Sequence, residues 1–269
     1  GYGSSTIITK NVEIILDNSS KDSDGAIIYG DVYGGSALGN VNCSFTDDTY
    51  QYSPDTRTNV TLKKGTIYGS LYGGGLGSTS VAANVNGPVK VEVHGGSVKK
   101  TSAAGSGGVY GANNINGAPQ RSVTVDIYGT DPAPAEGQYA LYAVYGGGNQ
   151  ADYLYGNGYP TVTVHNCDNS IEYVYGGGNA AAVAATDVTI WGGDVIGNVF
   201  GGGNGESGTA DVDGNVDLKI YGGTILNVFG GSNSKGKIGG NVNVKVNSQG
   251  EGEKAPCPMI IDNVYGGGN

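Results

Sequence analysis

Five ring-bearing residues end five successive alternating segments of the chain, and their side chains could bind sugars. In each segment apolar and polar residues alternate, so the last side chain points outward if the valines and isoleucines point inward. The five residues are His94, Tyr128, His165, Trp191 and Tyr221. Aromatic rings offer flat apolar faces that match those of sugar rings, so this exposed aromatic strip predicts glycan binding. The alternative is a solvated ladder that only stabilises the sheet.

Metal chemistry is not expected at these rings. His94 and His165 lie two units apart, which is about 10 Å if stacked strands are ~4.8 Å apart, whereas zinc holds each nitrogen at about 2.0–2.1 Å. Residues 211–217 carry three aspartates at spacings similar to those of an EF-type calcium loop, but the glycine stands fourth and no glutamate stands twelfth. We therefore expect no metal centre and no cofactor, with calcium at this segment as the one alternative.

The ring-bearing residues must be positioned by a repeat that runs through the whole chain. An apolar residue, an aromatic residue and one to three glycines recur eight times, often followed by Asn. The mean period is about 33 residues, and the intervals vary, which indicates one structural unit that carries loops of different length. The aromatic residues of the eight copies are Tyr33, Tyr72, Tyr110, Tyr145, Tyr175, Phe200, Phe229 and Tyr265.

Alternating segments between these copies predict strands with one buried face. Residues 89–93 (Val-Lys-Val-Glu-Val) and 216–220 (Val-Asp-Leu-Lys-Ile) show the pattern most clearly, and no segment shows a helical period of ten residues or more. A single unit cannot bury its apolar face alone, whereas stacked units bury it when equivalent strands pair in parallel. We therefore expect one all-β domain over residues 1–269, a parallel β-helix (solenoid) of about eight coils.

Asparagine ends five copies of the motif, and these side chains are expected to form a structural ladder. They are Asn149, Asn179, Asn204, Asn233 and Asn269. Asparagine tolerates the left-handed backbone of a tight corner. Stacked coil on coil, the amides would hydrogen-bond along the stack, and the aromatic residues would stack in register beside them. Ligand binding by these asparagines is the alternative.

The aromatic-Gly-Gly-Gly-Asn and Gly-Gly-x-Ile elements, as in residues 264–269 and 222–225, recur over nearly the whole chain. They resemble the right-handed parallel β-helix repeats of bacterial cell-surface and secreted proteins, above all the adhesin-like repeat proteins of gut anaerobes. The resemblance implies a right-handed β-helix, which the crossover rule for parallel strands also favours. Because this fold hosts many functions, the function has to be argued from the residues of a site.

Secreted β-helices include polysaccharide lyases and glycoside hydrolases, whose catalytic residues are not recognisable in this chain. Galacturonase-like enzymes pair Asp-Asp with Gly-His-Gly and Arg-Ile-Lys; Asp47-Asp48 is present, but the other two motifs are missing. The two arginines, Arg57 and Arg121, lie in or next to inserted loops. Glycosidic cleavage needs a carboxylate pair at a defined separation, and the sequence assigns no such pair. We therefore assign no catalytic residue.

Composition excludes several classes of protein and partner. Glycine makes up 52 of the 269 residues but is clustered, so the chain is not a collagen. The 14 basic and 24 acidic residues give a net charge of −10, which argues against a nucleic-acid partner. No apolar run approaches the ~18 residues of a membrane span. The three cysteines are more than 80 residues apart and are expected to be buried thiols.

Together these features predict a non-enzymatic repeat module, extracellular or on the cell surface, that acts as a bacterial adhesin and binds a polysaccharide or host glycan through the strip. A secreted polysaccharide lyase or glycoside hydrolase of the β-helix type is the alternative. The chain ends within a motif at Gly268-Asn269, and an open β-helix end leaves unpaired backbone groups. We therefore expect a segment of a longer surface protein, with further repeats or a partner at that end.

Overall fold

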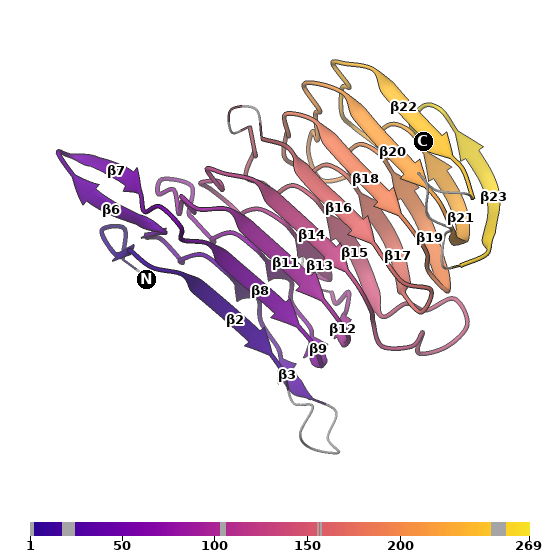
Figure 1. The fold of residues 1–269 in the computed structure, drawn as a ribbon, viewed down its shortest axis with the longest axis horizontal. Helices are drawn as coiled ribbons and strands as arrows, with labels where there is room; N and C mark the ends of the chain where they lie inside the picture. The colour runs from indigo at the N-terminus through magenta and orange to yellow at the C-terminus, as the bar shows by residue number, and fades with distance from the viewer. Residues whose placement is uncertain (1–2, 18–24, 103–105, 155, 157, 249–256) are drawn as a thin grey trace.

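The chain folds into β-strands stacked side by side along the long axis of the molecule, with the two termini toward opposite ends of the stack (Figure 1). The structure is a computed structural model that describes residues 3–17, 25–102, 106–154, 156, 158–248 and 257–269. Within these residues no helix forms, so none is present that could cross a membrane. The prediction of an all-β chain with stacked parallel strands is confirmed, because segments rich in Val and Ile between glycines favour strands.

The alternating segments form one parallel sheet of eight strands, each in register with its neighbours. In β11, the first, third and fifth residues are buried and the two between them are partly exposed, as the alternation predicts. In order along the sheet, the strands are β2 (Val12–Leu16), β8 (Thr58–Leu62), β11 (Val89–Val93), β14 (Val123–Ile127), β16 (Pro160–Val164), β18 (Thr186–Ile190), β20 (Val216–Ile220) and β22 (Val242–Val246).

The aromatic-glycine motifs form the ends of strands in a second parallel sheet of eleven strands. Its main path is β3 (Ala26–Ile28), β9 (Gly65–Ile67), β12 (Ser97–Val98), β15 (Leu141–Tyr145), β17 (Ser170–Tyr175), β19 (Val195–Phe200), β21 (Gly223–Phe229) and β23 (Met259–Tyr265). Three short strands continue the row of motifs beside β15: β4 (Val32–Tyr33), β10 (Leu71–Tyr72) and β13 (Gly108–Tyr110).

A third row of parallel contacts lies outside the two large sheets. β1 (Ile7–Ile8) pairs with β5 (Asn40–Val41), and single bridges continue the row from coil to coil. The bridged residues are Val41, Val85 and Pro119 in one run, and Tyr153, Val183, Val212 and Ile238 in another. An antiparallel hairpin of β6 (Cys43–Thr46) and β7 (Thr49–Tyr52) projects at the N-terminal end of the stack (Figure 1).

The aromatic residues of the motif form a continuous stack. From Tyr33 to Tyr265, successive ring centroids lie 4.5–5.0 Å apart with interplanar angles of 4–11°. This separation matches the ~4.8 Å between neighbouring strands, so parallel pairing in register sets the ring spacing. The aliphatic core is separate: Val91, Ile127 and Val144 belong to one fully buried cluster that runs through the stack.

Close approach of successive repeats requires glycine directly after the aromatic residue in every motif but the last. A Cβ added at Gly176 would overlap the carbonyl oxygen of Gly201, and it would lie 2.8 Å from a methyl group of Val188. The equivalent Gly146 meets Gly176 in the same way, one coil earlier. Because glycine alone lacks a Cβ, it allows the backbones to approach at these corners.

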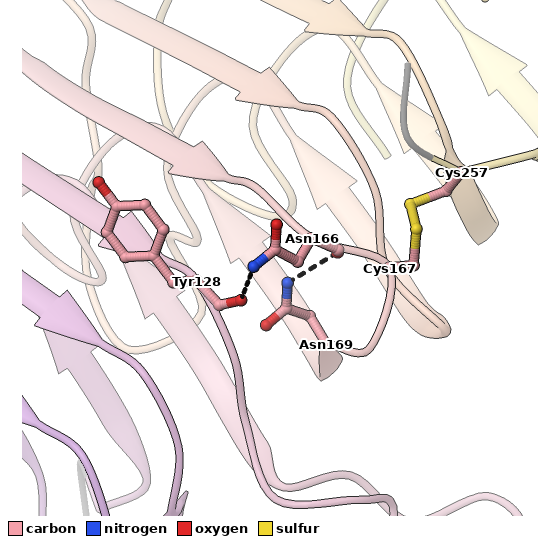
Figure 2. Close-up of a disulfide and its surroundings, with 5 residues drawn as sticks. All are labelled: Tyr128, Asn166, Cys167, Asn169 and Cys257. Carbon is pink, nitrogen blue, oxygen red and sulfur yellow. Dashed lines mark hydrogen bonds between the residues drawn. A yellow bond between two sulfur atoms is a disulfide. The ribbon is translucent and has the colours of Figure 1, made fainter. Parts of the chain in front are cut away.

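Cys167 and Cys257 form a disulfide, with a Cα–Cα distance of 5.5 Å (Figure 2). The expectation of three buried thiols is therefore wrong for these two residues, while Cys43 is a free, buried cysteine. The bond joins the turn after β16 to the segment before β23, although the two cysteines are 90 residues apart. Asn166 and Asn169 support the turn that carries Cys167, because their side-chain amides donate to the carbonyl oxygens of Tyr128 and Asn166.

Candidate functional site

The aromatic strip lies just after the strands of the eight-stranded sheet, but its members differ in exposure. His94 is exposed, and Tyr128, His165 and Trp191 are partly exposed. Tyr221 is only 2% exposed, so the expectation that it is part of an exposed surface is wrong. The Trp191 ring packs against Tyr221 with centroids 4.5 Å apart, and the Gly223 N–H, two residues from Tyr221, donates to the Pro258 carbonyl at 2.8 Å.

The rings of the strip stack on one another. Tyr128 stacks on His94 and on His165, with centroid distances of 4.7 and 4.2 Å, and Trp191 lies 4.5 Å from Tyr221 with a 34° tilt. Because neighbouring rings cover each other's faces, Tyr128 presents mainly its ring edge to solvent. Sugar rings stack on aromatic faces, so this arrangement favours the stabilising ladder over the sugar platform.

A continuous chain of amide hydrogen bonds, which we call the asparagine ladder, runs beside the aromatic stack. It contains the five asparagines identified from the motif and, in addition, Asn114. Each Nδ2 donates to the Oδ1 of the preceding asparagine, with distances of 2.7–3.0 Å. At its N-terminal end the Asn114 amide donates to the Tyr33 hydroxyl at 2.7 Å, and that hydroxyl donates to Asp31 Oδ2 at 2.8 Å. The ladder therefore ends on a carboxylate.

A groove lies at this end of the ladder, and sequence reasoning missed it. The first hollow of the groove has a volume of about 600 Å³, within the range typical of ligand sites. Tyr29 and Tyr68 form one wall as a stacked pair with centroids 5.6 Å apart, and they are 81% and 37% exposed. The polar side chains that line it include Asp31, Asn114, Asn149 and Gln150.

A second, smaller hollow continues the groove toward the C-terminal coils. Its volume is about 110 Å³, and Ser106 lines both hollows. Its lining includes Lys100, Tyr142 and Glu206. The Lys100 ammonium lies over the Tyr142 ring, 5.0 Å from its centroid, which is a cation–π contact.

Titratable groups cluster beside the second hollow. Burial raises the pKa of the Glu172 carboxyl above its usual value. Burial, together with the neighbouring Glu172 carboxylate, raises the pKa of Tyr173 to about 12. Tyr173 meets the Tyr142 ring edge-on, with centroids 5.5 Å apart and an interplanar angle of 74°. The cluster combines aromatic faces with negative charge, a pairing that attracts cations rather than anions.

The segment considered for calcium does not gather its side chains around one point. Asp211 and Asn215 accept hydrogen bonds from the backbone N–H groups of Lys237 and Asn241, and Asp217 accepts one from the Asn243 side chain. In the described part of the chain, no group of three His, Cys, Asp or Glu side chains is placed to hold a metal ion.

The acidic pair at residues 47–48 forms the turn of the β6–β7 hairpin, and both residues have positive φ values of 50° and 56°. Asp and Asn adopt this left-handed conformation more readily than most other residues. The hairpin turn therefore accounts for the presence of two aspartates here, and no role in catalysis is needed to explain the Asp-Asp element.

The groove left a weak signal in the sequence. Tyr29 follows Ile28 and Tyr68 follows Ile67, and the two isoleucines are register partners in the second sheet. The next unit carries Lys99 after Val98, and the unit after that carries Tyr142 after Leu141, so Lys99 interrupts the column of tyrosines. An interrupted column does not stand out among 19 tyrosines.

Comparison with known proteins identified no relative of this chain. No family model matches the sequence, and no curated protein or solved structure is significantly similar to it. The functional argument therefore depends on the residues of the groove.

Proposed function

We propose that this chain is a right-handed parallel β-helix of about eight coils that acts as a non-enzymatic carbohydrate-binding module of an extracellular or cell-surface bacterial adhesin. The two parallel sheets and the third row of bridges support a three-sided solenoid, since each repeat contributes to all three. The Cys167–Cys257 disulfide supports the extracellular location, because such bonds persist in oxidising compartments.

The observation that carries the proposed function is the exposed, stacked pair of Tyr29 and Tyr68 beside a row of hydrogen-bonding groups. A sugar ring has an apolar face and a rim of hydroxyl groups. Tyr29, which is 81% exposed although it stacks on Tyr68, offers the apolar platform. The exposed side chains of Gln150 and Asp31 offer donors and acceptors for the rim. Both kinds of contact are available within one hollow of sufficient volume.

The aromatic strip is a less suitable platform than this hollow. Its central ring, Tyr128, is covered on both faces by His94 and His165, whereas Tyr29 is the most exposed large apolar side chain described. We therefore place the sugar in the first hollow and assign the strip a stabilising role on the outside of the eight-stranded sheet.

The test is binding of the purified protein to an array of plant, microbial and mucin glycans, followed by calorimetry on the best ligand. The double variant Tyr29→Ala/Tyr68→Ala is expected to lose at least tenfold in affinity, which is about 1.4 kcal/mol. The matched control is His94→Ala/Tyr128→Ala, which removes a stacked pair from the strip. Circular dichroism shows whether each variant keeps its strands.

If His94→Ala/Tyr128→Ala alone loses binding, the sugar binds at the aromatic strip, and the assignment to the groove is overturned. Absence of binding to every glycan would overturn the proposed function. A reducing-end assay on the same polysaccharides tests the enzymatic alternative, for which we expect no product.

A further inference from the structure

The two hollows lie next to each other along the stack and share Ser106 in their lining, and together we call them the groove. The first hollow is lined by Asn114 and Asn149, and the second by Asn179 and Asn204, which are the next two members of the asparagine ladder. Because each member belongs to the following coil, the groove runs parallel to the ladder. A ligand that reaches both hollows therefore extends along the stack direction.

The charges in this groove disfavour an acidic ligand. Among the described residues that line the two hollows, Asp31 and Glu206 are the two carboxylates and Lys100 is the one cation. The protein as a whole carries a net charge of −10. Like charges repel most strongly where solvent is partly excluded, so a uronic-acid polysaccharide would be repelled, whereas a neutral or cationic one would not.

The second hollow holds a cation in the structure, and that cation belongs to the chain itself. The Lys100 ammonium lies over the Tyr142 ring, while Glu206 lines the same hollow. Burial raises the pKa of Tyr142, and the nearby Glu172 and Glu206 carboxylates raise it further. Lys100 is exposed and carries a long flexible side chain, so it can leave the hollow for solvent.

The sizes of the two hollows indicate which part of a ligand each would accept. The first, at about 600 Å³, has room for sugar rings against Tyr29 and Tyr68, and the second, at about 110 Å³, suits only a small substituent. An ammonium group on a sugar would make the same cation–π contact with Tyr142 that Lys100 makes, and it would face the same carboxylate.

From this geometry we infer that the groove binds a linear polysaccharide with free amino groups, and that Lys100 occupies the amino-group position until the ligand displaces it. The inference rests on the proposed function and specifies its ligand class. When the amino group of the ligand replaces the Lys100 ammonium, the charge in the second hollow stays the same. The Glu206 carboxylate therefore keeps a cation beside it.

The test compares chitosan oligomers with chitin oligomers of the same length by calorimetry. The two share a backbone and differ in whether the amino group is free and cationic or acetylated and neutral. The chitosan oligomer is expected to bind about tenfold more tightly, in the range of a partly desolvated cation–π contact with a nearby carboxylate. Glu206→Gln is expected to remove most of this preference while the affinity for the chitin oligomer stays the same.

Lys100→Ala provides the distinguishing result. If Lys100 competes with the ligand, its removal raises the affinity for the chitosan oligomer about threefold to tenfold. Lys99→Ala is the matched control, because it makes the same change in net charge one residue away and Lys99 does not line either hollow. An equal gain in both variants would indicate a long-range charge effect and would overturn the displacement.

Failure of this inference is distinguishable from failure of the proposed function. If chitin and chitosan oligomers bind equally well and Tyr29→Ala/Tyr68→Ala abolishes both, the carbohydrate site stands and the amino-group preference is wrong. Binding of other glycans without either oligomer also overturns the amino-sugar assignment. A loss of chitosan affinity in Lys100→Ala would show that Lys100 contacts the ligand and does not compete with it.

Discussion

Asn114 and Tyr33 are 81 residues apart in the chain, yet the Asn114 side-chain amide donates a 2.7 Å hydrogen bond to the Tyr33 hydroxyl. This contact joins the asparagine ladder to Asp31, which accepts from the same hydroxyl. All the ladder amides donate in the same direction, toward the N-terminal coils. Their dipoles therefore add along the chain, with the N–H ends toward a carboxylate, an arrangement in which each bond strengthens the next.

The interior of the ladder should be sensitive to loss of one amide. Asn179→Ala removes the amide donor to the Oδ1 of Asn149 and the acceptor of the Asn204 Nδ2, in a region where the asparagines are buried. We expect a loss of about 1–3 kcal/mol in the free energy of unfolding, measured by urea denaturation. Asn243→Ala removes an exposed side-chain bond to Asp217 and serves as the control, with an expected change within about 0.5 kcal/mol. Equal losses in both variants would argue against a special contribution from the ladder.

The disulfide should make the stability of the protein depend on reductant. Cys167→Ser/Cys257→Ser is expected to lower the free energy of unfolding by about 2–5 kcal/mol, because the bond constrains a long segment of the unfolded chain. The stability of this variant should no longer respond to a reductant. Cys43→Ala is the control, since it lacks a thiol but keeps the bond and hence the response. Thiol titration of the denatured, unreduced protein should find Cys43 alone; three reactive thiols would contradict the assignment.

Close approach of the coils predicts a position-dependent effect of alanine at equivalent glycines. Gly176→Ala should cost about 1–3 kcal/mol through overpacking against Gly201 and Val188. Gly266 occupies the same position in the last motif, where an added Cβ meets nothing within 4 Å. Gly266→Ala should therefore have little effect on the urea midpoint. Similar losses at both sites would indicate a backbone conformational effect instead of a contact between coils.

The buried tyrosines of the aromatic stack should limit stability at alkaline pH. Burial raises the pKa of Tyr175 well above its usual value of 10.0, so the folded state holds the phenolic proton more tightly than the unfolded state. The stabilising effect is complete below the unfolded pKa and is lost as pH rises from there toward the folded pKa. Tyr175→Phe should be close to neutral at pH 7, because Phe200 and Phe229 already occupy this stack, and it should reduce the loss above about pH 10. Unfolding followed by tyrosinate absorbance measures this effect. If the free energy of unfolding falls with pH above pH 10 as steeply in Tyr175→Phe as in the unmodified protein, the interpretation is contradicted.

The strands of the eight-stranded sheet and the residues of the aromatic stack were predictable because they repeat. Residues 89–93 and 216–220 alternate between apolar and polar side chains, and β11 and β20 occupy these ranges. A feature that recurs once in each coil is carried to the next coil by a single translation of ~4.8 Å. Parallel pairing in register then brings equivalent side chains together, whether they are valines, aromatic rings or asparagines.

The candidate site was much less predictable. The ring stacking of His94, Tyr128 and His165 follows from the repeat, but the same stacking covers the ring faces that a sugar would need. Tyr29 and Tyr68 belong to a column that Lys99 interrupts before Tyr142, so no periodic signal marked them. Their hollow also needs Gln150, whose equivalent in the next repeat is Ala180, and Thr101, which lies outside the strands.

The sequence by itself determined the strand pattern, the parallel register and the identity of the stacked columns, because these follow from local alternation and a motif repeated eight times. The tertiary structure decided which cysteines pair, that Tyr221 is buried and where the groove lies. The disulfide and the groove each depend on a contact between one irregular segment and a distant part of the stack. Such a contact occurs once, so no repeat encodes it, and only the path of the folded chain brings its two sides together.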